Sequence, residues 1–326
     1  MASVAAVMIA TAVTACSTAA SGENGKAPGP GSANINLAIV PSVNNVPAYI
    51  AQYDGFFAQQ GLHVNIQSIP SSAVVIADEL KGKVDVCAGA YLPFMADEAA
   101  GQKFRILDEG SVMGTQDRVL MTPKGSPITR VSQLAGKTIG LEATNSIGTL
   151  LVDEVLEANN VSPSSVHYET NPGGFQTMAT QLNAGAFDAA FFGEPFATEA
   201  QEKYSDTVLA NLGVGEAAQL PMTGYIATRK WADGHPAEVA AFNRAIQEAQ
   251  RVATANPQAL RKAIARSDHL SPVVADVIAL PGFVVGRVDA KSLQRAANAM
   301  LQFGQLSGKY STVVKNGSLI RSMIQP

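Results

Sequence analysis

Cysteine is almost absent from this chain of 326 residues, which contains only Cys16 and Cys87. Structural zinc sites draw on clustered Cys and His ligands, and no such spacing occurs here. The histidines are equally scattered, and no two of them form an HxH or HxxxH pair; they are His63, His167, His235 and His269. We therefore expect neither a metal site nor a bound cofactor.

Other chemical signatures are also missing. The chain lacks the G-x-S-x-G nucleophile turn, the phosphate-binding P-loop and the G-x-G-x-x-G dinucleotide motif. A net charge of −4 and the lack of a basic cluster with interleaved aromatic residues argue against a nucleic-acid partner. No apolar run is long enough to span a bilayer, which takes about 20 residues. Nothing here argues positively for an enzyme, so we expect a non-catalytic protein.

The N-terminus carries the first positive signal. The run Ala5–Ala15 is uncharged, and its length fits a signal-peptide h-region of roughly 7–15 residues. It ends in Val13-Thr14-Ala15-Cys16, the pattern of a lipidation cleavage box, although no Lys or Arg precedes it. The alternative is a buried N-terminal helix, which the Gly-, Ser- and Pro-rich residues that follow disfavour.

These patterns predict a lipoprotein signal peptide over residues 1–16, lipidation at Cys16 and a flexible tether over residues 17–33. The lipid anchor would hold the protein at the outer face of the cytoplasmic membrane. If Cys16 is lipidated, Cys87 has no disulfide partner. Because Cys87 lies in an apolar, strand-like run, we expect it to be a small buried hydrophobic residue.

From Ile35 onward, short β-rich runs alternate with helical segments, which is typical of a parallel α/β sheet. The first unit is expected to contain strands at Ile35–Val40, His63–Ile69, Val84–Ala88, Phe104–Leu107 and Arg118–Thr122, with helices at Val46–Gln60, Ala73–Lys81 and Leu92–Ala100. The second is expected to contain strands at Thr138–Leu141, Val166–Glu169 and Ala189–Phe192, with helices at Ile147–Asn159 and Phe175–Ala184. A strand at Pro221–Thr228 follows, and from Pro236 onward the pattern is nearly all helical.

Two segments of the chain repeat one pattern. Residues 79–86 and residues 181–189 both read as a helix end, a turn with glycine and a strand that opens with aspartate, Asp85 in the first and Asp188 in the second. The two units therefore look like variants of one α/β unit. The simplest architecture has two lobes with a cleft at the carboxyl ends of both sheets, where open α/β folds bind ligands.

Polar residues follow the strands predicted for the first unit. Asn44 and Asn45 come after the first strand, and their amides offer both donors and acceptors to a polar ligand. Ser71 stands at the next helix start. Tyr91 follows the third strand, and we expect its ring to form a wall of the ligand site. The alternative for Asn44, Asn45 and Ser71 is simple helix capping.

The second unit supplies two more candidate loops. Thr144, Asn145 and Ser146 stand at a helix start, where free N–H groups hold an anion or a polar headgroup, or where these side chains only cap the helix. Glu194 lies between a glycine and a proline at a strand end, close to Phe192. A carboxylate among aromatic rings suits a ligand with N–H donors or positive charge. The alternative is a solvated turn carboxylate beside core phenylalanines.

At these residues the chain resembles the periplasmic substrate-binding components of ABC importers for nitrate, sulfonates, taurine, bicarbonate and thiamine precursors, the SsuA/ThiY-like family. The resemblance runs from about Ile35 to the C-terminus. It rests on the order and spacing of short elements, namely Pro47-Ala48-Tyr49-Ile50-Ala51, Gly55-Phe56-Phe57, Gly82–Val86, Leu134–Gly140, and Gly185–Ala189 followed by Glu194-Pro195.

The resemblance implies an α/β fold of the class II periplasmic-binding-protein type, with two lobes, an interlobe cleft and two crossovers near Thr122–Lys124 and Met222–Gly224. One lobe would comprise residues 34–122 plus 225–326, and the other residues 123–224. The implied function is that of an extracytoplasmic solute-binding component of an ABC importer. Such a protein, expected to be a monomer, captures a small-molecule ligand by lobe closure and delivers it to its cognate ABC permease and ATPase.

The candidate loops lack Lys and Arg but hold Glu194 and Tyr91. They favour a planar ring with hydrogen-bonding nitrogens, such as a pyrimidine-type vitamin precursor, over a sulfonate or nitrate anion. Eukaryotic pyrimidine-precursor synthases share the fold, but their cysteine-rich CCCFC-like motif has no counterpart, since Cys87 is the only cysteine after Cys16. A transcription-factor effector domain would need a helix-turn-helix and a cytoplasmic location, which the lipidation box disfavours.

Overall fold

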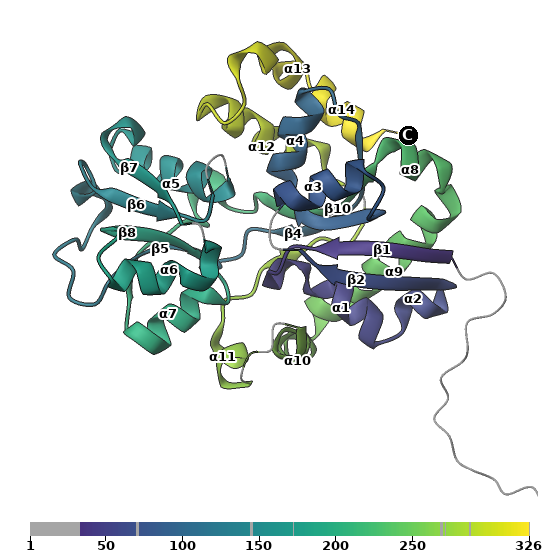
Figure 1. The fold of residues 1–326 in the computed structure, drawn as a ribbon, viewed down its shortest axis with the longest axis horizontal. Coiled ribbons are helices and arrows are strands. Elements are labelled where there is room, and N and C mark those ends of the chain that lie inside the picture. The colour runs from purple at the N-terminus through teal and green to yellow at the C-terminus, as the bar shows by residue number, and fades with distance from the viewer. Residues whose placement is uncertain are drawn as a thin grey trace, which may run out of the picture.

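A computed structural model of the chain describes residues 33–69, 72–143, 146–171, 173–267, 270, 272–286 and 288–325 (Figure 1). In spatial order, the first sheet consists of β11 (Gly282–Phe283), β4 (Phe104–Val112), β10 (Pro221–Thr228), β3 (Val86–Ala90), β1 (Ala33–Ile39) and β2 (Leu62–Ser68). The second sheet consists of β7 (His167–Thr170), β6 (Thr138–Leu141), β8 (Ala189–Gly193), β5 (Arg118–Thr122) and β9 (Thr207–Asn211).

Both sheets follow the same strand order. In the first, β1 runs parallel with β2 and β3; in the second, β6 runs parallel with β7 and β8. The next strand is antiparallel in each case, β10 beside β3 and β5 beside β8. Each of these antiparallel strands enters its sheet directly after the chain has left the other sheet. The two units are therefore built alike, as the repeated sequence pattern predicted.

Asp85 and Asp188, the aspartates of the repeated pattern, make equivalent hydrogen bonds in the two units. Asp85 accepts a hydrogen bond at Oδ2 from the Asn36 N–H (2.8 Å), and the Asp85 N–H donates to the Asn36 carbonyl (2.9 Å). Asp188 makes the equivalent pair with Thr138, with both distances 2.9 Å. Each aspartate thus fixes the start of one strand against its parallel neighbour, which explains why the pattern occurs twice.

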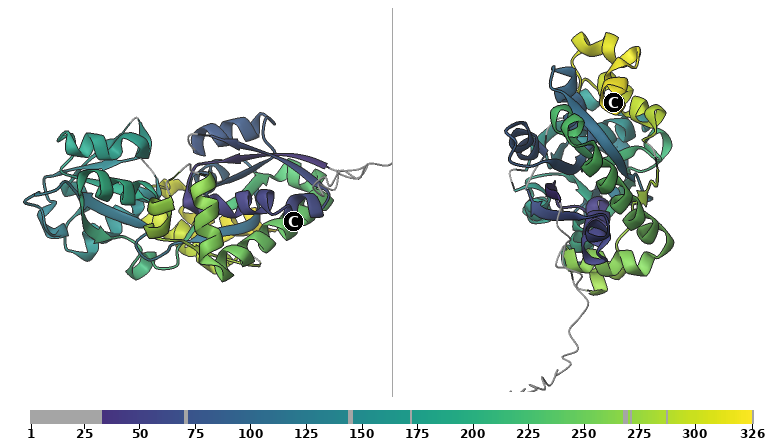
Figure 2. Two further views of the ribbon diagram at one scale, coloured as in Figure 1. Left: turned by 90° about the horizontal axis from the view of Figure 1, so that it is seen from below. Right: turned by 90° about the vertical axis from the view of Figure 1, so that its right-hand side faces the viewer.

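Helices cover both faces of each sheet (Figures 1 and 2). On one face of the first sheet lie α1 (Val46–Tyr53), α2 (Phe56–Gln59), α9 (Pro236–Ala255) and α10 (Pro257–Ser267). On its other face lie α3 (Ser72–Leu80), α4 (Tyr91–Ala99), α12 (Ala290–Gln302) and α14 (Ser318–Ile324), with α13 (Ser311–Lys315) beside them. The second sheet packs between α5 (Ile147–Ala158) on one face and α6 (Gly174–Asn183) and α7 (Phe196–Tyr204) on the other. The remaining helices are α8 (Arg229–Gly234) after β10, and α11 (Pro272–Val277) before β11.

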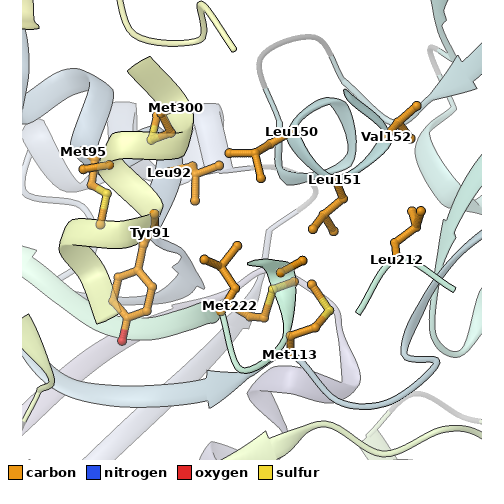
Figure 3. Packing of buried hydrophobic residues seen from close by; sticks show 14 of the residues in the cluster. Tyr91, Leu92, Met95, Met113, Leu150, Leu151, Val152, Leu212, Met222 and Met300 are labelled. Carbon is orange, nitrogen blue, oxygen red and sulfur yellow. The ribbon is translucent and has the colours of Figure 1, made fainter. Parts of the chain in front are cut away.

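The two units share a continuous apolar core beside the chain crossings. Leu150 and Leu151 of α5 belong to one cluster with Leu92 of α4, Met300 of α12 and Met222 of β10 (Figure 3). All five side chains are at most 2% exposed. Burial of apolar surface contributes about 25 cal/mol per Å², so this shared core stabilises the observed arrangement of the two sheets.

The prediction of one continuous helix over Val46–Gln60 is wrong. This segment forms two helices, α1 and α2, because Gly55 between them adopts a φ of +74°. This left-handed conformation is open to glycine, and it interrupts a right-handed helix. The sequence also did not predict α7, α8, β9 or β11.

The chain crosses between the sheets earlier than the resemblance implied. β5 pairs with β8 and β9, and β10 pairs with β3 and β4, so every residue of these two strands lies beyond its crossing. The crossings therefore fall within residues 113–117 and 212–220, and the positions near Thr122–Lys124 and Met222–Gly224 are corrected. The assignment of the remaining segments to two lobes stays a prediction.

The predicted signal peptide, the lipidation site Cys16 and nearly all of the predicted tether lie outside the described residues, since the described chain begins with Ala33 in β1. Within the described ranges, no helix combines the length and the apolar character needed to cross a membrane.

Candidate functional site

A group of mostly buried polar side chains lies where strands of the two sheets begin or end. We call it the polar cluster; its members are Ser42 and Asn44 after β1, Ser111 on β4, Asp117 and Arg118 at the start of β5, Glu142 after β6, Glu194 after β8 and Thr223 on β10. Both sheets contribute to it, as expected for a site between two lobes.

Asn44 lies at the centre of the polar cluster and is 1% exposed. Its Oδ1 atom accepts hydrogen bonds from the Ser42 hydroxyl (2.8 Å) and from Arg118 Nη2 (2.7 Å). Its Nδ2 atom donates to the Ser111 hydroxyl (2.9 Å), which in turn lies 2.9 Å from the hydroxyl of Thr223. One amide thus links the first sheet to a cation of the second.

Asn45 has a different environment. Its Nδ2 atom donates to the carbonyls of Val40 (2.7 Å) and Ala88 (3.2 Å). Val40 directly follows β1 and Ala88 lies within the neighbouring strand β3, so Asn45 holds the loop that carries Asn44 against the sheet.

Arg118 is the cation of the polar cluster, and it is only 6% exposed. Besides its bond to Asn44, its Nη1 atom donates to the Asp117 carbonyl (2.8 Å). Arg118 pairs with Gly193 across the antiparallel β5–β8 ladder. A Cβ atom at Gly193 would lie 3.1 Å from the guanidinium, so glycine at this position leaves the space that Arg118 occupies.

Glu194 follows Gly193 and is 6% exposed, so it is not the solvated turn carboxylate of the alternative interpretation. Its Oε2 atom accepts from the Thr198 N–H (3.1 Å), and its Oε1 atom accepts from the Thr198 hydroxyl (2.9 Å) and the Ala279 N–H (3.2 Å). Ala279 lies just before β11 of the first sheet. Glu194 therefore forms a second polar link between the two units.

Asp117 is the least well paired of the carboxyls. Its side chain is fully buried, and its Oδ2 atom lies 3.8 Å from Arg118 Nη1. The Asn44 amide and the Gly114 N–H are near enough to lower its pKa. Yet no described residue donates a hydrogen bond of good geometry to either carboxylate oxygen.

Glu142 is the third carboxyl, and it lies against the start of α5. A Cβ atom at Gly148 would be 2.6 Å from Glu142 Oε2, so a glycine in the first turn of α5 allows this close approach. Burial raises the pKa of Glu142, and the Ser146 hydroxyl and the Gly148 N–H are near enough to oppose this shift, although no described residue forms a hydrogen bond of good geometry with Oε2.

Charge in the polar cluster is unbalanced, since three carboxyls surround one guanidinium. Burial raises the pKa of Asp117, Glu142 and Glu194, because a low-dielectric environment disfavours the charged form. The positive charge of Arg118 opposes this shift at all three groups. The arrangement suits a partner that supplies further hydrogen-bond donors or positive charge.

Of the other predicted site residues, Ser146 lies beside Glu142 of the polar cluster, where its side chain lowers the pKa of that carboxyl. Ser146 is the N-cap of α5, where its hydroxyl accepts from the Thr149 N–H (3.4 Å). Tyr91 is fully buried in the apolar core (Figure 3). Its ring packs against Gly224, where a Cβ atom would lie 2.4 Å from the ring. Phe192 is fully buried in the core between the second sheet and α6. The last three of these residues, Ser71, Thr144 and Asn145, lie outside the described residues.

Sequence reasoning missed Asp117 and Arg118. It considered the loops after parallel strands, whereas these residues begin an antiparallel strand whose first residue lies beside the last residue of β8. A usable signal existed, because a charged pair directly precedes the apolar run Val119–Met121. The loops considered from the sequence do lack Lys and Arg, and Arg118 reaches the polar cluster from a different segment, the start of β5.

A half-open cavity of about 460 Å³ lies near the second crossing. Its walls come from α5, from residues 211–220 and from α12, and they include Leu151, Leu212, Leu220, Arg295 and Phe303. No member of the polar cluster lines it, so the two features are separate. Within the described ranges, no group of three or more His, Cys, Asp or Glu side chains is arranged to hold a metal ion.

The chain has relatives among curated proteins. The profile of the family described as NMT1/THI5 like matches residues 42–260. The 4-amino-5-hydroxymethyl-2-methylpyrimidine phosphate synthase of Uromyces fabae is 27% identical over 228 residues, which cover 66% of this chain and 64% of the synthase. A putative binding protein, YtlA, of Bacillus subtilis is 21% identical over 213 residues, which cover 65% of this chain and 64% of that protein. The chain thus spans about two thirds of the length of these relatives.

Solved structures share the architecture. The alkanesulfonate-binding protein SsuA of Xanthomonas axonopodis pv. citri, bound to MOPS, superposes with a TM-score of 0.72 at 16% identity. The match covers 85% of this chain and 95% of SsuA. At this level of identity the likeness establishes the fold, which is that of a periplasmic-binding protein with two mixed α/β sheets.

Proposed function

Because the chain belongs to the NMT1/THI5-like family, we propose that it is the solute-binding component of an ABC importer. It captures a small polar or aromatic molecule between its two lobes and delivers it to a permease and ATPase. The observation that carries this proposal is the polar cluster, in which Asn44 of one unit and Arg118 and Glu194 of the other meet between the sheets. Polar side chains buried between the two units do not add to an apolar core. They suit the capture of a polar ligand.

The protein would capture its ligand when the two lobes close around it. A ligand that contacts both lobes only when they are closed stabilises the closed state by that difference in affinity. The polar cluster supplies contacts from both sides, and residues 113–117 and 212–220 are the segments about which the lobes would move. No covalent step is needed.

The ligand class proposed from the sequence is a planar, nitrogen-bearing ring of the pyrimidine or vitamin-precursor type. The three carboxyls of the polar cluster support it, since they accept hydrogen bonds from ring and amino N–H groups. The alternative is a sulfonate- or nitrate-type anion, which Arg118 would bind. A thermal-shift screen of vitamins, pyrimidines, sulfonates and inorganic anions tests the proposal, because a bound ligand raises the melting temperature by mass action.

Replacing Glu194 with alanine is expected to weaken binding of the ligand found in that screen by about 1–3 kcal/mol, the cost of losing a buried hydrogen-bond acceptor. Calorimetric titration of the variant measures the effect. Glu202→Ala, an exposed position on the adjacent helix α7, serves as the matched control and should bind like the unaltered protein. Unchanged affinity in Glu194→Ala would limit Glu194 to its contacts with Thr198 and Ala279.

We further propose that residues 1–16 are a lipoprotein signal peptide and that a lipid on Cys16 anchors the protein to the outer face of the cytoplasmic membrane. Expressed in a bacterium, the unaltered chain should sediment with membranes, and Cys16→Ser should move to the soluble fraction. Cys87→Ser is the control, because Cys87 is buried in the first sheet and should not affect anchoring. Membrane association that survives Cys16→Ser would refute the anchor.

A second candidate function is that of a pyrimidine-precursor synthase, which the 27% identity to the Uromyces fabae enzyme favours. The chain lacks the cysteine-rich motif expected of such synthases, since only Cys87 follows Cys16. Incubation with the ligand found by the screen distinguishes the two functions: a binding protein returns the ligand unchanged, and a synthase yields product.

A further inference from the structure

A short segment of the first unit lies against the second unit beside the first crossing. We call residues 278–283 the strap; they lead from α11 into β11. Both ends of the strap are fixed to the first unit. Ile278 is 1% exposed in the core beside the first sheet, and its carbonyl accepts a hydrogen bond from Arg261 Nη1 (3.2 Å). At the other end, Phe283 pairs with Ser111 on β4.

The middle of the strap packs against the backbone of the crossings. A Cβ atom at Gly114, in the first crossing, would lie 2.4 Å from the Leu280 carbonyl oxygen and 2.9 Å from Pro281 Cα. A Cβ atom at Gly213, in the second crossing, would in turn lie 2.6 Å from the Gly114 carbonyl oxygen. Glycine lacks a Cβ atom, so these two glycines allow the strap and both crossings to pack backbone against backbone.

Glu194 holds the strap from the side of the second unit. Its Oε1 atom accepts a hydrogen bond from the Ala279 N–H (3.2 Å), and its other two bonds go to Thr198 within its own unit. α11, which leads into the strap, packs against α7, which begins just after Glu194 (Figure 1). Of these three bonds, only the one to Ala279 joins the two units. A movement of the lobes about the crossings would break it.

We propose that the strap and Glu194 form a conformational catch, which favours the closed arrangement of the lobes before any ligand is bound. The inference rests on the proposed solute-binding function and concerns the regulation of that same site. A ligand that binds only the closed lobes has an apparent affinity proportional to the fraction of the protein that is closed. The catch therefore sets the affinity for every ligand of the site without touching any of them.

The distance between the lobes tests the catch in the absence of ligand. Spin labels are attached at Val74→Cys and Gln176→Cys, two exposed positions in the first turns of α3 and α6, which belong to different units. The full chain carries Cys16→Ser, so that Cys16 does not react, and the buried Cys87 stays unlabelled. Double electron–electron resonance then gives the distribution of distances between the two labels.

Two variants release the catch by different routes. Ala279→Pro removes the N–H that Glu194 accepts and leaves the carboxylate in place. Gly114→Ala keeps that N–H but places a Cβ atom against the Leu280 carbonyl, so the strap must move away. Each variant is expected to shift the distances to longer values. If one of them does not fold, the other still tests the inference.

Thr198→Val is the matched control. It removes a hydroxyl that donates to the same oxygen of Glu194, but Thr198 and Glu194 belong to the same unit. The Thr198 N–H and the Ala279 N–H still hold the carboxylate in this variant. Its distances between labels should match those of the unaltered chain.

Ligand affinity gives an independent measurement. Calorimetric titration with each ligand found in the thermal-shift screen should show binding weakened about three- to tenfold in Ala279→Pro, the effect of one typical hydrogen bond on an equilibrium constant. Gly114→Ala should also bind more weakly, and within each variant the factor should be the same for all ligands, because the closed fraction falls for all of them. Thr198→Val should bind as the unaltered chain does.

The outcomes separate the catch from the function beneath it. Unchanged distances in the folded release variants would overturn the catch and leave the solute-binding function standing. Distances that lengthen as much in Thr198→Val would show general loosening, and weaker binding of only one class of ligand would show a direct ligand contact; either result also overturns the catch. If the screen yields no ligand, the solute-binding function fails, and the distances still decide whether the catch exists.

Discussion

Replacing Arg118 with alanine is expected to lower the free energy of unfolding by about 3–5 kcal/mol, the cost of removing one partner from a buried charge pair. Arg118 is 6% exposed, and its guanidinium is the cation that opposes the raised pKa of Asp117, Glu142 and Glu194. Without Arg118, these three carboxyls must either stay charged in a buried, low-dielectric environment or bind protons. The loss should therefore be largest at high pH and should shrink as the pH falls.

Denaturant unfolding of the variant at several pH values measures this effect. Lys124→Ala is the matched control, because Lys124 is an exposed cation just beyond the other end of β5 and should change stability by less than about 0.5 kcal/mol. Combining Arg118→Ala with Asp117→Asn should recover part of the loss, since one uncompensated charge is removed. A loss that is small and independent of pH would contradict a buried, charge-compensating Arg118.

Asp108 is expected to make the protein less stable as the pH rises from about 4 to about 7. This carboxyl on β4 is 1% exposed, and burial raises its pKa from 3.8 to about 7, although hydrogen bonds from Gln247 Nε2 (2.8 Å) and the Glu109 N–H (2.9 Å) oppose the shift. In that pH range the folded protein keeps the proton on Asp108 and the unfolded chain releases it. Because the unfolded state then binds fewer protons, stability falls with rising pH, by about 4 kcal/mol in all.

The variant Asp108→Asn isolates this contribution, since asparagine does not titrate. Its side-chain oxygen still accepts from the Glu109 N–H, and Gln247 can turn its amide to present an acceptor. The unaltered protein should lose stability relative to Asp108→Asn by about 1.4 kcal/mol per pH unit between pH 4 and 7. Asp54→Asn, at an exposed carboxyl after α1, should show no such difference. Parallel stability curves for the unaltered protein and Asp108→Asn would show that Asp108 does not carry this proton.

Local sequence patterns were sufficient to predict most helices and strands and to predict that the two units are built alike. Alternation of strand and helix patterns predicted both sheets, and the repeated aspartates Asp85 and Asp188 predicted their likeness, because each acts on a neighbouring strand in the same way in both units. The continuous helix expected over Val46–Gln60 failed at Gly55, where a backbone angle open to glycine overrides apolar periodicity.

The candidate site could be predicted only in part. Asn44 and Glu194 were identified from their places after strands, and both lie in the polar cluster. Tyr91 also follows a strand and Phe192 lies at the end of one, yet both are in the apolar core. Position after a strand indicates which edge of a sheet a residue occupies, but it does not determine to which side of the backbone the side chain points.

The class of fold, the two similar units and the polar loops after the strands depend on residues close together in the chain, so they could be predicted from sequence alone. The charges of the candidate site depend on contacts between distant segments. Arg118 bonds to Asn44 across 74 positions, and Glu194 bonds to Ala279 across 85. The contact of Arg118 with Asn44 depends on antiparallel β5, whose first residue lies beside the last residue of β8. Strand pairing over that distance leaves no local signal, so the loops considered from the sequence did not include Arg118, which is buried in the polar cluster.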